Sequence, residues 1–262
     1  MSITSRVSGW ATRLLPVKLV RSRLSEGVAS LTFDDFPRSA WVIAGRILES
    51  FKVRATYYVA GGLCGCRKDG LEYFTEDDLL AVHAAGHEVG GHTFAHVCVP
   101  ALSSKSLVDD ADRNAEFVRR ILGDVWLGSF AYPHGDVSPR TKLLFSRIFP
   151  SCRGIESGFN ARIIDLAQLR CIPLYSRLWQ PSRLERLAKE TAVAKGWIIL
   201  RTHDVSERPT AWGCTPAVLK HALSILQETG IVMSPVKHAV ASLTFTKSSH
   251  GDGAIPVDGR RA

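Results

Sequence analysis

The sequence lacks several features that would place a protein of this length in a common functional class. It contains no G-x-G-x-x-G and no Walker A pattern, so nothing in it indicates a nucleotide-binding loop. No apolar run approaches the ~20 residues of a transmembrane helix, so no transmembrane segment is expected. The six cysteines are too few for a disulfide-stabilised scaffold in 262 residues, and the C-x-C pair at Cys64 and Cys66 is too closely spaced for a zinc knuckle. Reduced thiols are therefore expected.

Basic residues are in excess, but they are not grouped. The formal net charge is +8, yet Lys and Arg are spread along the chain and no basic run is interleaved with aromatic residues. A generally basic surface is the simpler interpretation, and we expect no nucleic-acid partner.

The first 24 residues form a basic segment without a continuous apolar core. Arg13, Pro16 and Lys18 interrupt its apolar residues, so residues 1–24 do not resemble a secretory signal peptide, and a cytoplasmic location is expected. The segment is weakly amphipathic, which predicts an extension that covers the core as a surface helix. The tail over 246–262 is polar and rich in glycine, and we expect it to be disordered.

Strand-like and helix-like stretches alternate along most of the chain. The predicted strands cover 29–33, 55–59, 87–90, 129–131, 151–153, 169–172, 197–201 and 231–233. The predicted helices cover 39–50, 75–85, 105–122, 181–196 and 215–230, and one more begins at 138. Such alternation is typical of parallel strands covered by helices, in a number close to that of a barrel.

Two adjacent acidic residues, Asp34 and Asp35, follow the first of these strands. Adjacent carboxylates repel each other, and each is costly to desolvate. They therefore either face solvent in a turn or lie against a positive charge. In parallel α/β folds the chemistry lies at the carboxyl ends of the strands, where this pair stands.

A pair of histidines follows another predicted strand in the stretch GHEVGGHTFAH, which begins at Gly86. On a helical turn, residues four apart point the same way, so neutral imidazoles at His92 and His96 could share one divalent ion. Taken alone, surface or core histidines explain the pair equally well. His87 is expected to make a structural hydrogen bond, and His83 to lie on a helix surface.

Two further strand ends carry polar candidates. The strand 197–201 leads into His203, whose imidazole can titrate near neutral pH and act as an acid or a base. The strand 129–131 leads into Y-P-H-G at 132–135, a Pro-x-Gly turn that can offer backbone N–H groups to an anion. A hydrogen-bonded loop histidine and an ordinary turn are the alternatives.

Taken together, these stretches resemble the NodB-like polysaccharide deacetylases, carbohydrate esterase family four. The shared order is T-F-D-D at 32–35, H-T-x-x-H at 92–96, the Pro-x-Gly turn, and a strand ending in histidine, and it spans about 29–241. The resemblance implies an α/β fold, a distorted (β/α) barrel of about seven strands, in a catalytic domain over 25–245.

The resemblance also implies a role for each motif residue. One divalent metal ion, usually zinc, with cobalt, nickel or manganese as alternatives, would be held by Asp35, His92 and His96. Asp34 would be the general base and His203 the general acid. The residues that would contact the oxyanion or the substrate are Tyr132, Pro133, His134, Gly135 and Trp212, with the backbone N–H at His134 facing the oxyanion.

The sequence departs from the family pattern at three places. Phe36-Pro37 follows the acids where a glycine is common, which predicts a stiffer and narrower rim. Ala131 stands where the family often has an arginine that steadies the base, so Arg153 or Arg170 is the candidate replacement. The fourth motif has no clear counterpart, and Trp179 and Asp165 are its only candidates.

A metal-dependent deacetylase acting on an N-acetylated amino sugar, in an oligosaccharide or exopolysaccharide, is the function that these residues predict. The candidates for a sugar-binding groove are aromatic, namely Trp41, Phe94, Tyr132 and Trp212, with core packing as the alternative for each. Two other functions stay open: hydrolysis of a small amide or ureide, as in allantoinase-like relatives, and sugar binding without catalysis. The sequence does not predict the oligomeric state.

Overall fold

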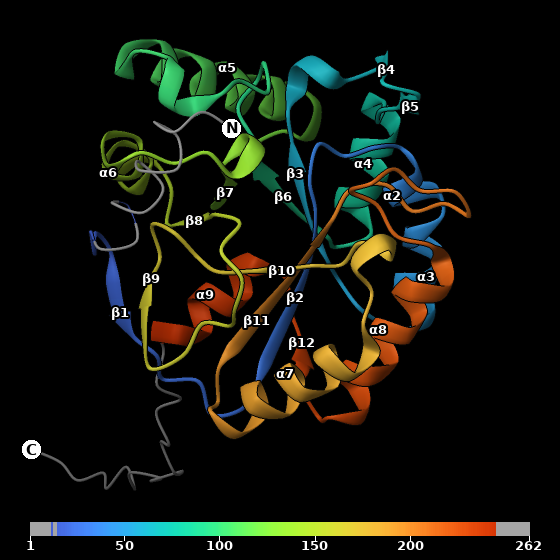
Figure 1. Cartoon of the computed structure of the whole chain (residues 1–262). Helices are drawn as coiled ribbons and strands as arrows, with labels where there is room; N and C mark the ends of the chain where they lie inside the picture. Colours follow the sequence, from blue (N-terminus) through green and yellow to red (C-terminus); the bar gives the residue numbers. More distant parts are fainter. Residues whose placement is uncertain (1–11, 13–14, 245–262) are drawn as a thin grey trace, which may run out of the picture.

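A curled sheet of parallel strands forms the centre of the structure, a computed structural model that describes residue 12 and residues 15–244. The predicted tail over 246–262 lies outside these residues. The strand order is β10-β11-β2-β3-β6-β7-β8, and β12 also pairs with β2. The bounds of these strands are β2 Val28–Phe33, β3 Thr56–Val59, β6 Glu88–Gly91, β7 Ser129–Ala131, β8 Ser151–Arg153, β10 Ile172–Pro173, β11 Trp197–Thr202 and β12 Val232–Met233. The predicted distorted (β/α) barrel is confirmed (Figure 1).

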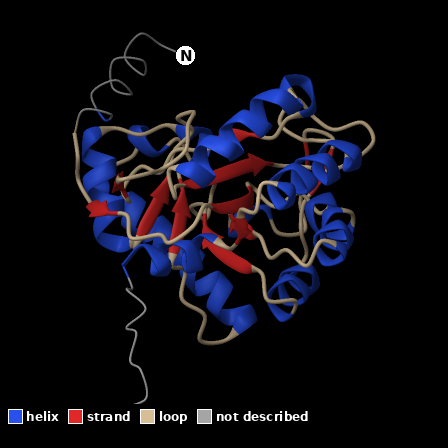
Figure 2. Ribbon diagram, turned by 90° about the horizontal axis from the view of Figure 1, so that it is seen from below, coloured by secondary structure: helices blue, strands red, loops and turns tan. Residues whose placement is uncertain are grey.

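Helices surround this sheet on its outer side (Figure 2). They are α2 Ser39–Val42, α3 Ala44–Ser50, α4 Glu76–Ala84, α5 Ser104–Leu122, α6 Pro139–Ile148, α7 Pro181–Val193, α8 Pro216–Glu228 and α9 Val236–Thr244. The start of α4 follows from its sequence, because the Thr75 side chain accepts a hydrogen bond from the Asp78 N–H and the Asp78 carboxylate accepts one from the Thr75 N–H. None of the described helices is long and apolar enough to cross a membrane.

The secondary structure differs from the prediction at several places. The helix predicted over 39–50 is divided at Ile43, whose φ is −105°. The strand predicted over 169–172 is displaced, because Leu169 makes only an isolated bridge to Arg153 and the regular strand is β10. The helix α9 was not predicted. Its first turn is held by buried side chains, since the Thr56 hydroxyl and the Glu88 carboxylate accept the N–H groups of Val236 and Lys237.

The surface helix predicted for the N-terminal extension is wrong over 15–24. Residues Leu19–Arg21 instead form β1, which pairs antiparallel with β9, Ile163–Asp165. The Asp165 carboxylate fixes the register by accepting the backbone N–H groups of Val17 and Lys18. Val20 packs into a hydrophobic cluster while Arg21 is exposed, an alternation that suits a strand.

His87 makes the structural hydrogen bond that was predicted. Its Nδ1 accepts the Ala55 N–H at 3.0 Å, and its ring is buried edge-on against Trp41 and Tyr57. Burial, with a smaller contribution from Arg54, lowers the pKa of His87 from 6.5 to about 4. The folded state therefore holds this imidazole neutral at a pH where the unfolded chain protonates it.

The buried imidazole predicts a loss of stability in mild acid. Since the folded pKa lies below the unfolded value, stability is fully present above pH 6.5 and falls as the pH drops toward about 4, by about 3 kcal/mol in total. Replacing His87 by Gln keeps an acceptor for the Ala55 N–H and removes the titration. Thermal unfolding at about pH 7.5 and 4.5 should show a smaller acid-induced fall in Tm for His87→Gln than for the wild type. The control is His83→Gln on the exposed face of α4. An equal acid-induced fall in Tm in both variants would show that His87 does not cause the loss of stability.

Candidate active site

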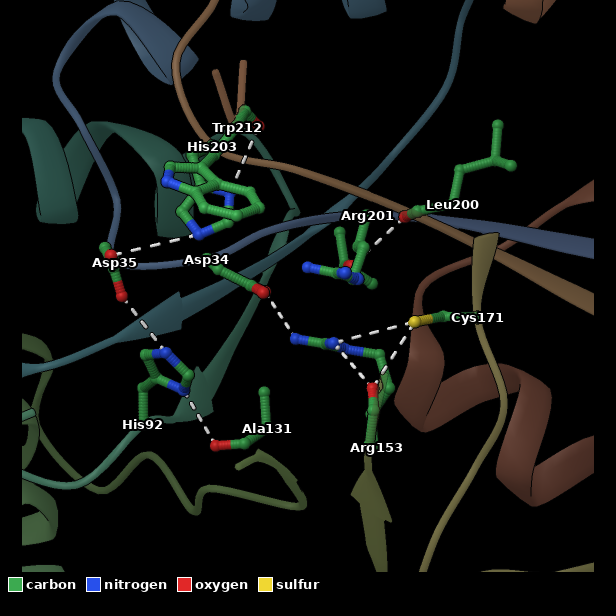
Figure 3. A network of polar contacts seen from close by, with 12 residues as sticks. Asp34, Asp35, His92, Ala131, Arg153, Cys171, Leu200, Arg201, His203 and Trp212 are labelled. Atoms are coloured by element: carbon green, nitrogen blue, oxygen red, sulfur yellow. Dashed lines mark hydrogen bonds and ion pairs between the residues drawn. The ribbon is translucent and has the colours of Figure 1, made fainter. Parts of the chain in front are cut away.

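A tight turn after β2 directs the two adjacent acids to different partners. Asp35 and Phe36 adopt left-handed backbone angles, with φ of 62° and 58°. The Asp34 N–H donates to the Thr202 carbonyl at the end of β11, and the Phe36 N–H donates back to the Asp34 carbonyl. As a result, Asp34 points toward Arg153, whereas Asp35 lies between His92 and His203 (Figure 3).

Asp35, His92 and His96 form a cluster of possible metal ligands. The Asp35 Oδ1 atom lies 3.1 Å from His92 Nε2 and 3.0 Å from His96 Nε2, and the ligand atoms of the three residues lie within 4.8 Å of one another. The predicted helical turn is wrong, because residues 92–96 form a loop in which Thr93 and His96 have positive φ. This loop, rather than a helix, brings the two rings to a centroid distance of 5.1 Å.

The protonation of this cluster suits a cation. The Ala131 carbonyl can only accept, so the 2.7 Å contact places a hydrogen on His92 Nδ1 and leaves the Nε2 lone pair facing Asp35. In their protonated form, the two imidazoles would instead donate to Asp35 and hold its pKa well below the usual value, against the effect of burial. The buried Oδ1 atom also has no hydrogen-bond partner among the described residues. One carboxylate and two imidazoles that converge in this way fit a divalent ion such as zinc.

Asp34 is buried against a cation from β8, a strand that β3, β6 and β7 separate from β2 in the order of the sheet. An Arg153 Nη2–H donates to Asp34 Oδ1 at 2.5 Å, and both side chains are almost completely buried. Burial alone would raise the pKa of Asp34, but the charges of Arg153 and His203 lower it by more. The pKa therefore lies below its usual value, and the carboxylate stays ionised. Arg170, the other candidate replacement, is exposed and lies beside Gly158. The cation opposite Asp34 is therefore Arg153, which is the register partner of Ala131 across β7 and β8.

His203 stands on the other side of Asp35. Its Nδ1 lies 3.2 Å from the Trp212 carbonyl, which accepts the hydrogen, and its Nε2 faces Asp35 Oδ2 at 3.9 Å. Burial lowers the pKa of His203, while the carboxylates of Asp34 and Asp35 oppose that effect. The strand end thus holds one ring nitrogen fixed and presents the other to the centre of the site.

The Pro-x-Gly turn closes the site next to His96. The His134 ring packs on His96 at a centroid distance of 4.5 Å, and His134 has a φ of 58°. The His134 N–H has no hydrogen-bond acceptor among the described residues, whereas the Gly135 N–H donates to the Tyr132 carbonyl. The turn therefore leaves one backbone donor free beside the cluster.

These residues share one cleft of about 640 Å³. Its lining includes most of the predicted site residues, namely Asp34, Asp35, His92, His96, Tyr132, His134, Gly135, His203 and Trp212. Pro133 is buried outside the lining. Trp212 is 53% exposed, and the guanidinium of Arg177 lies 4.9 Å from its ring centroid. Trp212 is the exposed aromatic surface of this cleft.

Several sequence candidates lie elsewhere. Trp41 packs against His87, and the Arg113 guanidinium lies over the Phe94 ring; neither aromatic side chain lines the cleft. For the fourth motif, Trp179 packs against His221, and Asp165 pairs with Lys142. Neither candidate lines the cleft, because these side chains serve packing and strand registration.

Sequence reasoning also missed residues that line the cleft, among them Lys68, Tyr73 and Arg201. Lys68 belongs to a two-stranded hairpin, β4 Arg67–Lys68 and β5 Leu71–Glu72, which forms part of the rim. The sequence did contain a signal for Arg201, because it is the one charged residue in β11, whose sequence WIILRT is otherwise mostly apolar.

The expected narrowing of the rim by Phe36 is wrong. Phe36 is fully buried and stacks on Phe74 with ring centroids 4.8 Å apart and an interplanar angle of 5°. It also contacts Tyr57 at 4.8 Å, and Pro37 bridges to Tyr73. Phe36 therefore anchors the turn that carries Asp35 to the core instead of facing the cleft.

The left-handed backbone at Phe36 predicts an unusual order of stability. Phe36→Ala should cost about 3–5 kcal/mol of unfolding free energy through lost packing. Phe36→Gly loses the same ring but fits the positive φ, so it should be more stable than Phe36→Ala by about 1 kcal/mol. Urea unfolding measures both. The control pair is Phe74→Ala and Phe74→Gly at a backbone without positive φ, where glycine should be the less stable, and the same order at both positions would contradict the prediction.

Known proteins are similar to this chain in sequence and in fold. The family model described as polysaccharide deacetylase matches residues 21–147. The chain is 31% identical over 121 residues to a chitin deacetylase from Colletotrichum lindemuthianum, covering 46% of this chain and 48% of that one. It is 29% identical over 102 residues to the peptidoglycan-N-acetylmuramic acid deacetylase PdaC of Bacillus subtilis strain 168, covering 38% of this chain and 20% of that one. The matches thus span about half of the first relative and a fifth of the second.

The fold is similar to a solved structure over most of both chains. The Xyl-CE4 domain of a multidomain xylanase from the hindgut metagenome of Trinervitermes trinervoides superposes with a TM-score of 0.59 at 19% identity, covering 83% of this chain and 91% of that one. At this identity the likeness shows the fold. The sequence matches and the order of the strand-end motifs agree with each other, and they support a polysaccharide deacetylase.

Proposed function

We propose that this chain is a metal-dependent deacetylase that removes the N-acetyl group from an amino sugar in an oligosaccharide or polysaccharide. The observation that carries the proposal is the placement of Asp34 and His203 on two sides of the Asp35, His92 and His96 cluster. Hydrolysis of an amide needs an activated water and a protonated leaving amine. An acid and a base flanking one cation site meet both needs.

The residues of the chain divide the reaction between them. When bound, a divalent ion supplies Lewis acidity that makes water more acidic and polarises the acetyl carbonyl. Asp34, kept ionised by Arg153, accepts the proton of the attacking water. The N–H of His134, which has no acceptor among the described residues, would donate to the oxyanion that develops from the carbonyl oxygen.

His203 delivers a proton to the leaving nitrogen. In its protonated form both ring nitrogens carry hydrogen, so Nδ1 stays on the Trp212 carbonyl while Nε2 donates to the sugar amine. The carboxylates of Asp34 and Asp35 favour that charged form against the effect of burial on the pKa of His203.

The shape of the cleft supports a saccharide. Its volume of about 640 Å³ exceeds what a small ureide fills, and the exposed Trp212 ring offers a face on which a pyranose can stack. The names of two relatives, a chitin deacetylase and an N-acetylmuramic acid deacetylase, fit the same substrate class. The small-amide alternative would require a more closed pocket.

An acetate-release screen tests the proposal. The purified protein, loaded in turn with zinc, cobalt, nickel or manganese, is offered chitooligosaccharides, acetylated exopolysaccharide, peptidoglycan fragments and small ureides. We expect acetate from at least one glycan, loss of release with a chelator, and recovery on adding back the metal. Turnover of ureides alone would support the small-amide function, and glycan binding without any acetate would support a sugar-binding module.

A further inference from the structure

Arg201 is a cation in the cleft that the proposed reaction does not use. It is the fifth residue of β11, pairs in register with Thr32 and Pro173, and lies two residues before His203. Its Nη1–H donates to the Tyr175 hydroxyl, and its side chain lines the cleft together with Asp34 and Trp212. Strands on both sides fix its backbone, so its direction is set by the sheet.

The two buried cations in the described part of the chain each pair with a carboxylate, whereas the partly buried Arg201 makes no ion pair within it. Arg153 pairs with Asp34 at 2.5 Å, and Lys142 pairs with Asp165 at 2.8 Å. Within residues 15–244 no carboxylate oxygen lies within 4.0 Å of the Arg201 guanidinium. Its Nε is fully buried, and neither Nε nor Nη2 has a hydrogen-bond acceptor among the described residues. The guanidinium is thus partly desolvated and has no direct ion pair with any described residue, so an anionic ligand in the cleft would add one.

The charge around the cleft favours such a ligand. Asp34 and Asp35 are balanced by Arg153 and Arg201, so a divalent ion on the ligand cluster leaves the centre with an excess of two positive charges. On the rim, Lys68 and Asp69 offset each other. A low-dielectric cleft with this excess attracts an anionic group.

We propose that Arg201, with the Tyr175 hydroxyl beside it, binds a carboxylate on the substrate close to the scissile amide. The preferred substrate is then an acidic N-acylated amino sugar, in which the carboxylate belongs either to the sugar, as in a lactyl ether, or to the acyl group. This inference rests on the proposed deacetylase function and narrows its substrate class. Nη2 and the second hydrogen of Nη1 are the donors that a carboxylate in the cleft can accept from, in a bidentate pair.

The test compares matched substrates on wild type and variants. The probes are an N-acetylglucosamine tetramer, an oligomer of the same length that contains N-acetylmuramic acid, and an N-malonylglucosamine oligomer. The kcat/KM ratio of each acidic probe to the neutral one is measured for wild type, Arg201→Met and Arg201→Lys, and Kd is measured for any probe that is not turned over. The matched control is Arg170→Met, which removes an exposed arginine outside the cleft.

We expect the wild type to prefer one acidic probe, and Arg201→Met to lower that preference about 30-fold or more, because a buried charge-assisted hydrogen-bond pair is lost. Arg201→Lys should recover part of the preference, and Arg170→Met should leave it within about threefold. Which acidic probe responds tells whether the carboxylate lies on the sugar or on the acyl group. The inference is overturned if the neutral probe is turned over best and Arg201→Met does not change the kcat/KM ratio of acidic to neutral probe. The deacetylase function would still stand in that case. If an acidic probe binds in a way that depends on Arg201 but no probe is hydrolysed, the inference holds and the proposed function fails.

Discussion

Asp34→Asn is expected to lower kcat for acetate release by about 10³-fold or more while the protein keeps its metal. An amide of the same shape cannot accept the proton of the attacking water. Metal content should not change, since Asp34 is not one of the three clustered ligands and its Oδ1 is bound by Arg153. Acetate release and metal analysis on the same preparation provide the two measurements. Activity within about tenfold of the wild type would remove Asp34 as the base.

The same substitution leaves Arg153 buried opposite a neutral group, so a loss of stability accompanies the loss of activity. Breaking a buried ion pair from one side costs about 3–5 kcal/mol of unfolding free energy. The matched variant is Asp34→Asn combined with Arg153→Met, which removes the unpaired charge. We expect the double variant to regain part of the stability and none of the activity. Recovery of activity together with stability would show that Asp34 acts only through folding.

Asp35→Ala is expected to reduce the bound divalent metal from one ion per chain to nearly none. Asp35 provides the only carboxylate of the ligand cluster, and two neutral imidazoles alone hold a divalent ion weakly. The zinc Kd should rise more than about 100-fold, and acetate release should fall to background, because even removing an outer partner of a metal ligand can cost that much. Equilibrium dialysis with zinc and metal analysis of the purified protein measure the effect.

His92→Ala should act in the same way, whereas His83→Ala is the control. His83 is an exposed histidine on α4, so its loss should leave metal content unchanged. Unchanged metal content in both Asp35→Ala and His92→Ala would place the ion elsewhere.

Much of the fold followed from local signals. The strands β2, β6, β7, β8 and β11 and the helices that start at Thr75, Ser138 and Thr215 were predicted because apolar runs, N-caps and stop glycines are short-range features. The pairing of β1 with β9 was not predictable in this way. It joins segments more than 140 residues apart, and β9 has only three residues. The docking of α9 depends on Thr56 and Glu88, whose acceptors are fixed only when the sheet forms.

The candidate site also has a part that local signals predicted and a part that depends on the assembled sheet. The acids, the two histidines of the H-x-x-x-H pair and His203 stand at strand ends, so the fold class alone placed them together. Their exact environment needed the sheet register. The sequence offered Arg153 and Arg170 as equal candidates, and only the position of β8 beside β7 decides between them. The direction of Phe36 depends on positive φ at two consecutive residues, which no local pattern of apolar residues reveals.

The register of Arg153 with Ala131 has a consequence for judging chains that carry the motifs of polysaccharide deacetylases. The arginine that commonly steadies the base in the third motif is missing here, yet the acid still has a buried cation at the same level, supplied from the adjacent strand. An empty motif position therefore does not by itself indicate a dead enzyme. Two places in the sheet can provide the same counter-ion, and inactivity should be inferred only when both lack one.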